Sequence, residues 1–213
     1  MKNRIHANSQ NINVRGFVEN FSTNTTLFLP SIQREYVWAK SNREGYRDAI
    51  LKNMTPTPII LAEIESAIST AKESDNKEDL KKLNEWYNQG YRHISIDGGN
   101  RTRFLNGEYN KLNGNFKNLQ DETKSFFNHV IQVLEYFGLT VKQMHEMALK
   151  VNMGVPWNKA DKRNVLSGKI PEYVRNLTNK YTETFSYFLT PKEVKTRKVD
   201  EFIGFFLLYN QTK

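Results

Sequence analysis

The chain has 213 residues, of which 38% are hydrophobic, and its formal net charge is +8 at pH 7. No apolar run approaches the roughly 20 residues of a membrane-spanning helix, and no apolar stretch follows the first six residues, so we expect neither a membrane segment nor a signal peptide. The lack of cysteine excludes disulfides, cysteine–zinc sites and thiol catalysis and fits a cytoplasmic protein, while the basic excess favours polyanions such as nucleotides or DNA.

Short strands and helices are predicted to alternate in the first half of the chain. Residues 14–18 predict a short element, and residues 27–29 predict a strand closed by proline. Ser41 and Glu44 have the spacing of a capping box, which predicts a helix start there. The apolar runs 59–64 and 91–96 predict two buried strands. Exposed helices are expected between them, over the charged stretch 65–92, and another helix from Thr102 onward.

The second half of the chain is predicted to be mostly helical. Asn106-Gly107 and Asn113-Gly114 are turn sequences that predict a short hairpin containing Tyr109 and Leu112. Residues 130–136 predict a strand. Helices should follow that are capped at Thr140, start at Asn158 or Lys159 and end at Gly168, open at Pro171, and cover residues 200–209. The fold class is therefore α+β: a small mixed sheet in residues 1–115, with the charged insertion 65–92, and a mainly helical part in residues 116–213.

A strand that runs into glycines and arginines is the most informative motif. Ile96-Asp97-Gly98-Gly99-Asn100-Arg101-Thr102-Arg103-Phe104 follows an apolar stub. Glycine lets the backbone approach a ligand closely, and arginine presents a planar fork of donors that matches phosphate oxygens. This set of groups is typical of a phosphate site, although the same sequence also fits an ordinary β-turn. It is neither a P-loop nor a Rossmann fingerprint.

A second cluster, at residues 33–38, combines Gln33, Arg34 and Tyr36 with Trp38. Glutamine and arginine after a proline-ended strand can bind phosphate or ribose, and a tryptophan can stack on a base. The aromatic residues of this cluster are better interpreted as core residues, since large aromatic side chains dominate protein cores. Function is assigned to Gln33 and Arg34.

Other polar groups give weaker signals. None of the four histidines forms a spaced metal pair, and nothing in the sequence pairs a serine nucleophile with a histidine. A basic run precedes the last helix and predicts either a solvated surface or contacts with a nucleic-acid backbone. Its members are Lys192, Lys195, Arg197 and Lys198.

Together, Gln33-Arg34-x-Tyr36-Val37-Trp38 and Asp97-Gly98-Gly99-Asn100-Arg101 resemble a known family. It is the ParB-like domain of unknown function at the N-terminus of GmrSD-type restriction endonucleases and SspE-type proteins. That family has a Gln-Arg-x-Tyr-x-Trp signature, a proline-bounded apolar strand and an Asp-Gly-Gln-Gln-Arg motif. Pro58-Ile59-Ile60-Leu61 matches the strand, and residues 151–164 are similar to a third block. The two family glutamines are replaced by Gly99 and Asn100, which puts hydrolysis in doubt.

The resemblance, which covers residues 27–170, implies a ParB/sulfiredoxin-like fold that binds or hydrolyses a nucleoside triphosphate. It implies work on DNA, in restriction, phage defence or phage DNA modification, with a nuclease partner or a homo-oligomer. The nucleotide would contact Gln33, Arg34, Tyr36, Gly98, Gly99, Asn100, Arg101 and Thr102. Asp97 and Arg101 would act in catalysis, and Asp97 would hold Mg²⁺, which prefers carboxylate oxygens. Lys192, Lys195, Arg197 and Lys198 would contact DNA.

Two alternatives compete with this hypothesis. One is a non-enzymatic DNA-binding or interaction protein, favoured by the basic charge. The other is a metal-dependent DNA nuclease using Asp97, which lacks evident supporting carboxylates. One expectation about the architecture applies to the nucleotide-binding hypothesis and to both alternatives. The 59–64 and 94–96 strands should share a sheet, and Arg34 and Arg101 should then meet at an anion or at a structural acid such as Glu35 or Asp97.

Overall fold

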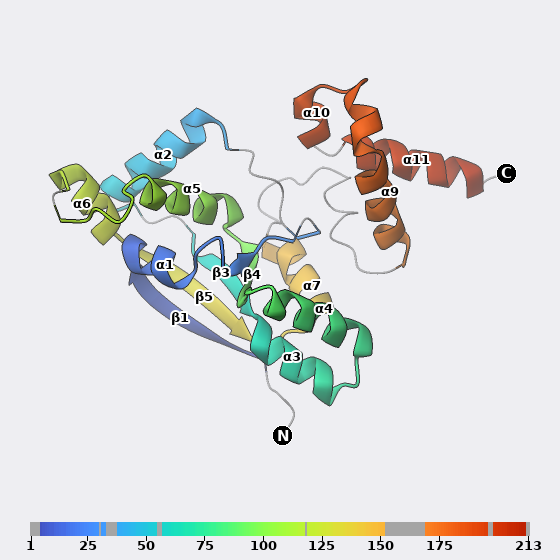
Figure 1. Cartoon of the computed structure of the whole chain (residues 1–213), viewed down its shortest axis with the longest axis horizontal. Coiled ribbons are helices and arrows are strands. Elements are labelled where there is room, and N and C mark those ends of the chain that lie inside the picture. Colours follow the sequence, from blue (N-terminus) through green and yellow to red (C-terminus); the bar gives the residue numbers. More distant parts are fainter. Residues whose placement is uncertain are drawn as a thin grey trace.

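The computed structural model describes residues 5–29, 31–32, 38–54, 57–117, 119–151, 169–195 and 198–211. It confirms the α+β class: one mixed sheet carries helices on both faces, and a helical region follows (Figure 1). The sheet order is β1-β5-β3-β4-β2. Its strands are β1 (His6–Asn13), β2 (Thr26–Leu27), β3 (Ile59–Glu63), β4 (His93–Asp97) and β5 (Val130–Phe137).

Strand β3 lies at the centre of the sheet and is buried on both faces. It pairs antiparallel with β4 and parallel with β5, so the two strands expected to share a sheet do so. Side chains alternate along a strand, so Ile59 and Leu61 enter one core while Ile60 and Ala62 enter the other. Strand β5 lies beyond residue 115, so the sheet draws on both of the expected parts of the chain.

Helices cover the two faces of this sheet. The core that contains Leu61 lies under α1 (Val14–Asn20), α2 (Lys40–Leu51), α5 (Gly99–Asn110) and α6 (Asp121–Asn128). The core that contains Ala62 lies under α3 (Ile64–Glu73), α4 (Lys77–Asn88) and α7 (Val141–Val151), which lie on the other side of the sheet in Figure 1. The charged stretch 65–92 therefore forms helices between two core strands, as expected, and buries Ala67, Ile68, Ala71 and Leu83.

Side-chain caps explain where several of these helices begin. The Glu63 carboxylate accepts from the Ser66 N–H at 2.9 Å, and the Asn76 side chain accepts from the Asp79 N–H at 3.1 Å. The Thr140 hydroxyl accepts from the Gln143 N–H at 3.2 Å, which confirms the predicted cap of α7. Each cap satisfies one of the amide groups that a helix N-terminus leaves without a partner.

Three local predictions are wrong. Helix α2 begins at Lys40 rather than after Ser41, because the Asn42 side chain accepts from the Ala39 N–H at 3.1 Å and fixes an earlier start. Helix α5 begins at Gly99 rather than at Thr102. It also continues through Asn106-Gly107, so no hairpin forms there, because Phe104, Leu105 and Asn106 are buried on the sheet and tertiary packing overrides the turn propensity.

One strand is missing from the sequence predictions. Residues 6–13 are polar, and β1 is an edge strand whose first four residues are exposed. It pairs with β5 along its whole length, from His6 with Phe137 to Asn13 with Val130. Such a strand is held mainly by backbone hydrogen bonds, and it leaves no hydrophobic alternation in the sequence.

The helical region consists of α9 (Lys169–Ser186), α10 (Pro191–Lys195) and α11 (Lys198–Gln211), gathered at the upper right of Figure 1. The helices opening near Pro171 and over residues 200–209 are therefore confirmed, while the helix expected over 158–168 lies outside the described residues. Val199 and Ile203 are buried, and the rings of Phe185 and Phe202 stack at 6.0 Å. Among the described residues, no helix is long and apolar enough to cross a membrane.

Candidate functional site

The turn from β4 into α5 positions the glycine–arginine motif. Gly98 adopts φ 86° at the N-cap, and the helix begins immediately after it. The first amide groups of α5 lack intrahelical partners and carry the positive end of the helix dipole, as in phosphate-binding turns. Gly98 and Gly99 are buried, whereas Asn100 is half-buried. The Asn100 Oδ1 atom is itself buried, whereas the Asp97 side chain is 25% exposed, so the Asp97 carboxyl is a polar group of the turn that solvent reaches.

Arg101 is bound inside the protein. Its guanidinium donates to the carbonyl oxygens of Thr57 and Pro58, the latter at 3.1 Å, and to Asp97 Oδ2 at 2.9 Å. The residue is only 8% exposed. These bonds fasten the start of β3 to the first turn of α5, and Asp97 supplies the structural acid that the arginine requires. In this arrangement Arg101 holds the turn in place rather than reaching toward a ligand.

The geometry also explains Gly98. A Cβ at this position would lie 3.0 Å from Ile59 Cγ1 and 3.1 Å from Arg101 Nη2, and the positive φ disfavours any side chain. Asp97 has one oxygen bound to Arg101, so its other oxygen is the one available to a cation or a water. Within the described ranges, no group of three histidine, aspartate or glutamate side chains could hold a metal ion.

Hydroxyl and amide oxygens of β2, β4 and the first turn of α5 are buried without a hydrogen-bond partner among the described residues. They are Thr26 Oγ1, Ser95 Oγ, Asn100 Oδ1 and Thr102 Oγ1. Residues 93, 95 and 97 alternate with the core residues Ile94 and Ile96, so Ser95 shares the Asp97 face of β4. Buried hydroxyls of this kind are usually satisfied by ordered water. These strands and the start of α5 therefore bury polar oxygens, a feature that the strand pattern did not predict.

The remaining predicted site residues are only partly described. Gln33, Arg34 and Tyr36 lie outside the described residues, so the expected meeting of Arg34 with Arg101 stays a prediction. Trp38 packs against Tyr46 at 5.2 Å and Phe104 at 6.1 Å, which fits the core interpretation of this side chain. Lys198 is exposed at the start of α11, Lys192 and Lys195 belong to the short helix α10, and Arg197 is outside the described part.

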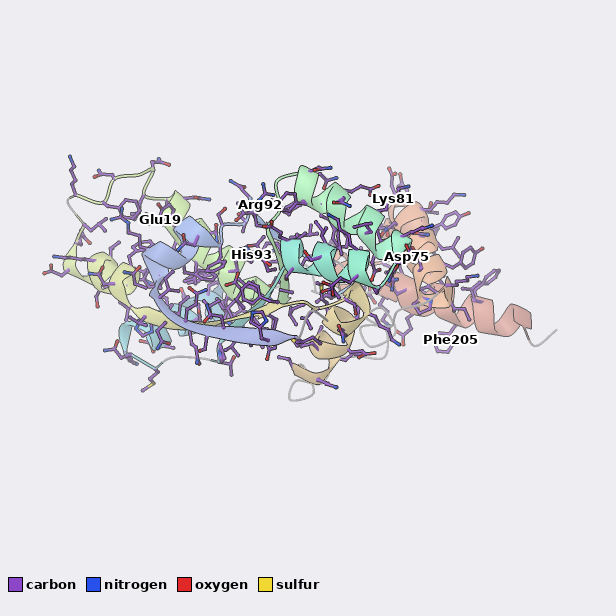
Figure 2. The ribbon with its side chains drawn as sticks, turned by 90° about the horizontal axis from the view of Figure 1, so that it is seen from below. Glu19, Asp75, Lys81, Arg92, His93 and Phe205 are labelled. Atoms are coloured by element: carbon purple, nitrogen blue, oxygen red, sulfur yellow. The ribbon has the colours of Figure 1, made fainter. Side chains whose placement is uncertain are left out.

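A histidine–glutamate pair spans the sheet on the face covered by α1. His93 Nε2 lies 2.7 Å from Glu135 Oε1, and Gln10 Nε2 donates to Glu135 Oε2 at 3.3 Å. The Phe21 ring meets the His93 ring edge-on at 4.9 Å. His93, labelled in Figure 2, thereby ties β4 to β5 across β3. These contacts are all with structural elements, so we assign the pair to the scaffold.

No sequence motif pairs a serine with a histidine, but the structure brings one such pair together. Ser31 Oγ lies 3.0 Å from His145 Nε2, although the two residues are 114 positions apart. The other ring nitrogen, Nδ1, lies 2.8 Å from the Val141 carbonyl oxygen. Sequence reasoning missed this pair because neither residue belongs to a motif, and only the packing of the loop around residue 31 against α7 brings them together.

The surroundings of His145 favour its neutral form. Burial lowers the pKa of His145, and the positive charges of Arg175 and Lys82 lower it further, against the Val141 hydrogen bond and the negative charge of Asp79. Burial likewise raises the pKa of Asp79. Lys82 lies 2.8 Å from Glu78 Oε1 and 3.5 Å from Glu172 Oε1. A histidine beside a serine is thus kept able to accept a proton at neutral pH.

Comparisons of the chain with protein-family models, curated proteins and solved structures found no significant match.

Proposed function

We propose that this chain is a nucleotide-binding module of a DNA-associated restriction, phage-defence or phage DNA-modification system, and hydrolysis of the nucleotide is tested as a separate step. The observation that carries the proposal is the strand–glycine–helix turn at β4–α5, where helix amides, Asn100 and the free oxygen of Asp97 lie together. The resemblance of residues 33–38 and 97–101 to the ParB-like family supports the same assignment, with Arg34 and Gln33 as further phosphate and sugar contacts.

The structure changes one role within this proposal. Because Arg101 is committed to Asp97 and two carbonyl oxygens, we assign it to holding the turn, and the phosphates would be bound by the backbone amides and Arg34. Asp97 would offer its second oxygen to Mg²⁺ or to the attacking water. Thr102 is fully buried, so it would support the turn from within.

Calorimetry with ATP, GTP and CTP in the presence of Mg²⁺ tests the proposal, together with phosphate release measured with and without DNA. We expect the chain to bind one of these nucleotides. Asn100→Ala should weaken this binding, whereas Asn110→Ala, at the exposed end of the same helix, should leave it unchanged. No binding of any nucleotide by the folded chain would exclude this function. Binding without phosphate release is the result expected if Gly99 and Asn100, which stand at the positions of the two family glutamines, prevent hydrolysis.

The second candidate is a non-enzymatic protein that binds DNA or another protein. The helical region favours binding to another protein. Eight large apolar side chains there are exposed, among them Phe205 and Phe206 at 64% and 67%. Phe205 lies at the end of the molecule formed by α9 to α11 in Figure 2. With about 200 Å² for a fully exposed aromatic side chain, the eight side chains together expose roughly 1000 Å².

A second copy of the chain is the partner that this surface fits. One side of a standard interface buries about 800 Å², and residues 202–211 carry no charged side chain, which favours an apolar contact with a second copy over phosphate binding by this part of α11. Light scattering after gel filtration should give a dimer mass that becomes monomeric in Phe205→Glu/Phe206→Glu. Gel shifts with DNA at two salt concentrations test the alternative that the chain binds DNA. In that case Lys198→Ala should weaken DNA binding, and the affinity should fall steeply with salt.

A further inference from the structure

We propose that Ser31 and His145 form a nucleophile–base pair that transfers an acyl group from a neutral carboxylic ester to water. This activity goes beyond nucleotide binding, and it rests on a different part of the structure, where the loop after β2 meets helix α7 (Val141–Val151).

The pair has the geometry of an activated serine. The 3.0 Å distance between Ser31 Oγ and His145 Nε2 falls within the 2.6–3.2 Å of a nucleophile and its base. The Val141 carbonyl can only accept a hydrogen bond, so Nδ1 carries the ring proton of the neutral histidine. Nε2 is then the unprotonated nitrogen, and the serine hydroxyl must donate to it. A third group therefore orients the base, as activated serines require.

Exposure and charge fit the same role. His145 is 7% exposed, so its ring is held away from bulk water, whereas Ser31 is half-buried and keeps part of its surface in contact with solvent. Lys82 on α4 is paired with Glu78 and Glu172. The His145 ring faces both signs of charge, positive from Arg175 and Lys82 and negative from Asp79, so the surroundings select neither an anionic nor a cationic substrate, and a neutral ester is the class we assign.

The reaction balances with water as the only co-reactant. Ser31 Oγ attacks the ester carbonyl carbon while its proton passes to His145 Nε2. The bond from that carbon to the alcohol oxygen then breaks, and the alcohol leaves with the proton from Nε2. A water molecule repeats the sequence on the acyl-serine, which releases the carboxylic acid and restores the serine hydroxyl.

The full chain is treated with an alkyl fluorophosphonate, and the modified residue is identified by mass spectrometry. The expected result is one adduct, on Ser31, that is lost in Ser31→Ala and formed about a hundredfold more slowly in His145→Gln. The matched controls are Ser69→Ala and His6→Gln, which alter an exposed serine and an exposed histidine. Both should label like the natural chain. Release of nitrophenol from p-nitrophenyl butyrate should follow the same order.

Two results would overturn the proposal. One is a folded natural chain, verified by circular dichroism, that forms no adduct on Ser31. The other is an adduct on Ser31 whose rate is unchanged in His145→Gln with the fold intact. If His145→Gln does not fold, the labelling rate of His145→Asn is measured in its place. The presence or absence of the Ser31 adduct on the folded natural chain decides the first outcome without any variant. Nucleotide binding is measured separately, so failure of the ester chemistry is distinguishable from failure of that function.

Discussion

Replacing Arg101 by methionine tests whether this arginine holds the β4–α5 turn or binds a ligand. The guanidinium is 10% exposed as a side chain and makes three charge-assisted hydrogen bonds, to the Thr57 and Pro58 carbonyls and to Asp97. Hydrogen bonds to charged groups contribute about 1.5–3 kcal/mol each, and removing one partner of a buried ion pair costs about 3–5 kcal/mol.

The expected loss is smaller than the sum of these contributions. Asp97 is 25% exposed, so its carboxylate can regain water, and methionine fills most of the volume that the arginine occupied. We therefore expect Arg101→Met to lower the free energy of unfolding by about 2–4 kcal/mol. With a urea slope of about 2 kcal/mol per molar, this shifts the unfolding midpoint by roughly 1–2 M.

Urea unfolding followed by circular dichroism measures the shift, and calorimetry with the nucleotide is run beside it. Arg15→Met is the matched control, because Arg15 and Glu19 form an exposed ion pair at 2.8 Å that should contribute little. If Arg101→Met unfolds at the same urea concentration as the natural chain yet loses nucleotide binding, the structural role is refuted and Arg101 is a phosphate ligand.

Two further predictions concern the same turn and the buried histidine. Gly98→Ala should destabilise the fold by about 1–3 kcal/mol, because Gly98 has φ +86° and the new Cβ would crowd Ile59. The control is Gly107→Ala in helix α5, where a new Cβ would meet nothing within 4 Å. Thermal melts should show this control to be neutral or more stable by up to about 1 kcal/mol. Burial lowers the pKa of His145 in the folded state, so below about pH 6.5 the unfolded chain takes up a proton that the folded chain refuses. Stability should thus fall as the pH falls through that value, by up to about 1.4 kcal/mol per pH unit, with Asp79, Lys82 and Arg175 as the charged groups around the ring. Urea midpoints at about pH 7.5 and 5.5 should lie closer together in His145→Gln, and an equal spacing in both proteins would show that His145 does not titrate as proposed.

The sequence by itself determined those features that depend on neighbouring residues. Apolar runs located β3, β4 and β5, Thr140 located the start of α7, and the charged stretch 65–92 was correctly placed in helices between two core strands. The α+β class follows from these elements. The sequence also identified the Asp97–Arg101 run as a distinct turn, because a strand followed by two glycines is a local signal.

Only the tertiary structure decided how distant residues meet. It paired the polar strand β1 with β5, extended α5 through a turn sequence, bound Arg101 to the backbone of residues 57 and 58, and placed Ser31 against His145 across 114 positions. The physical reason is that each of these contacts joins groups far apart in the chain. Backbone pairing, burial and hydrogen bonding at such separations leave no periodicity or spacing in the sequence from which they could be predicted.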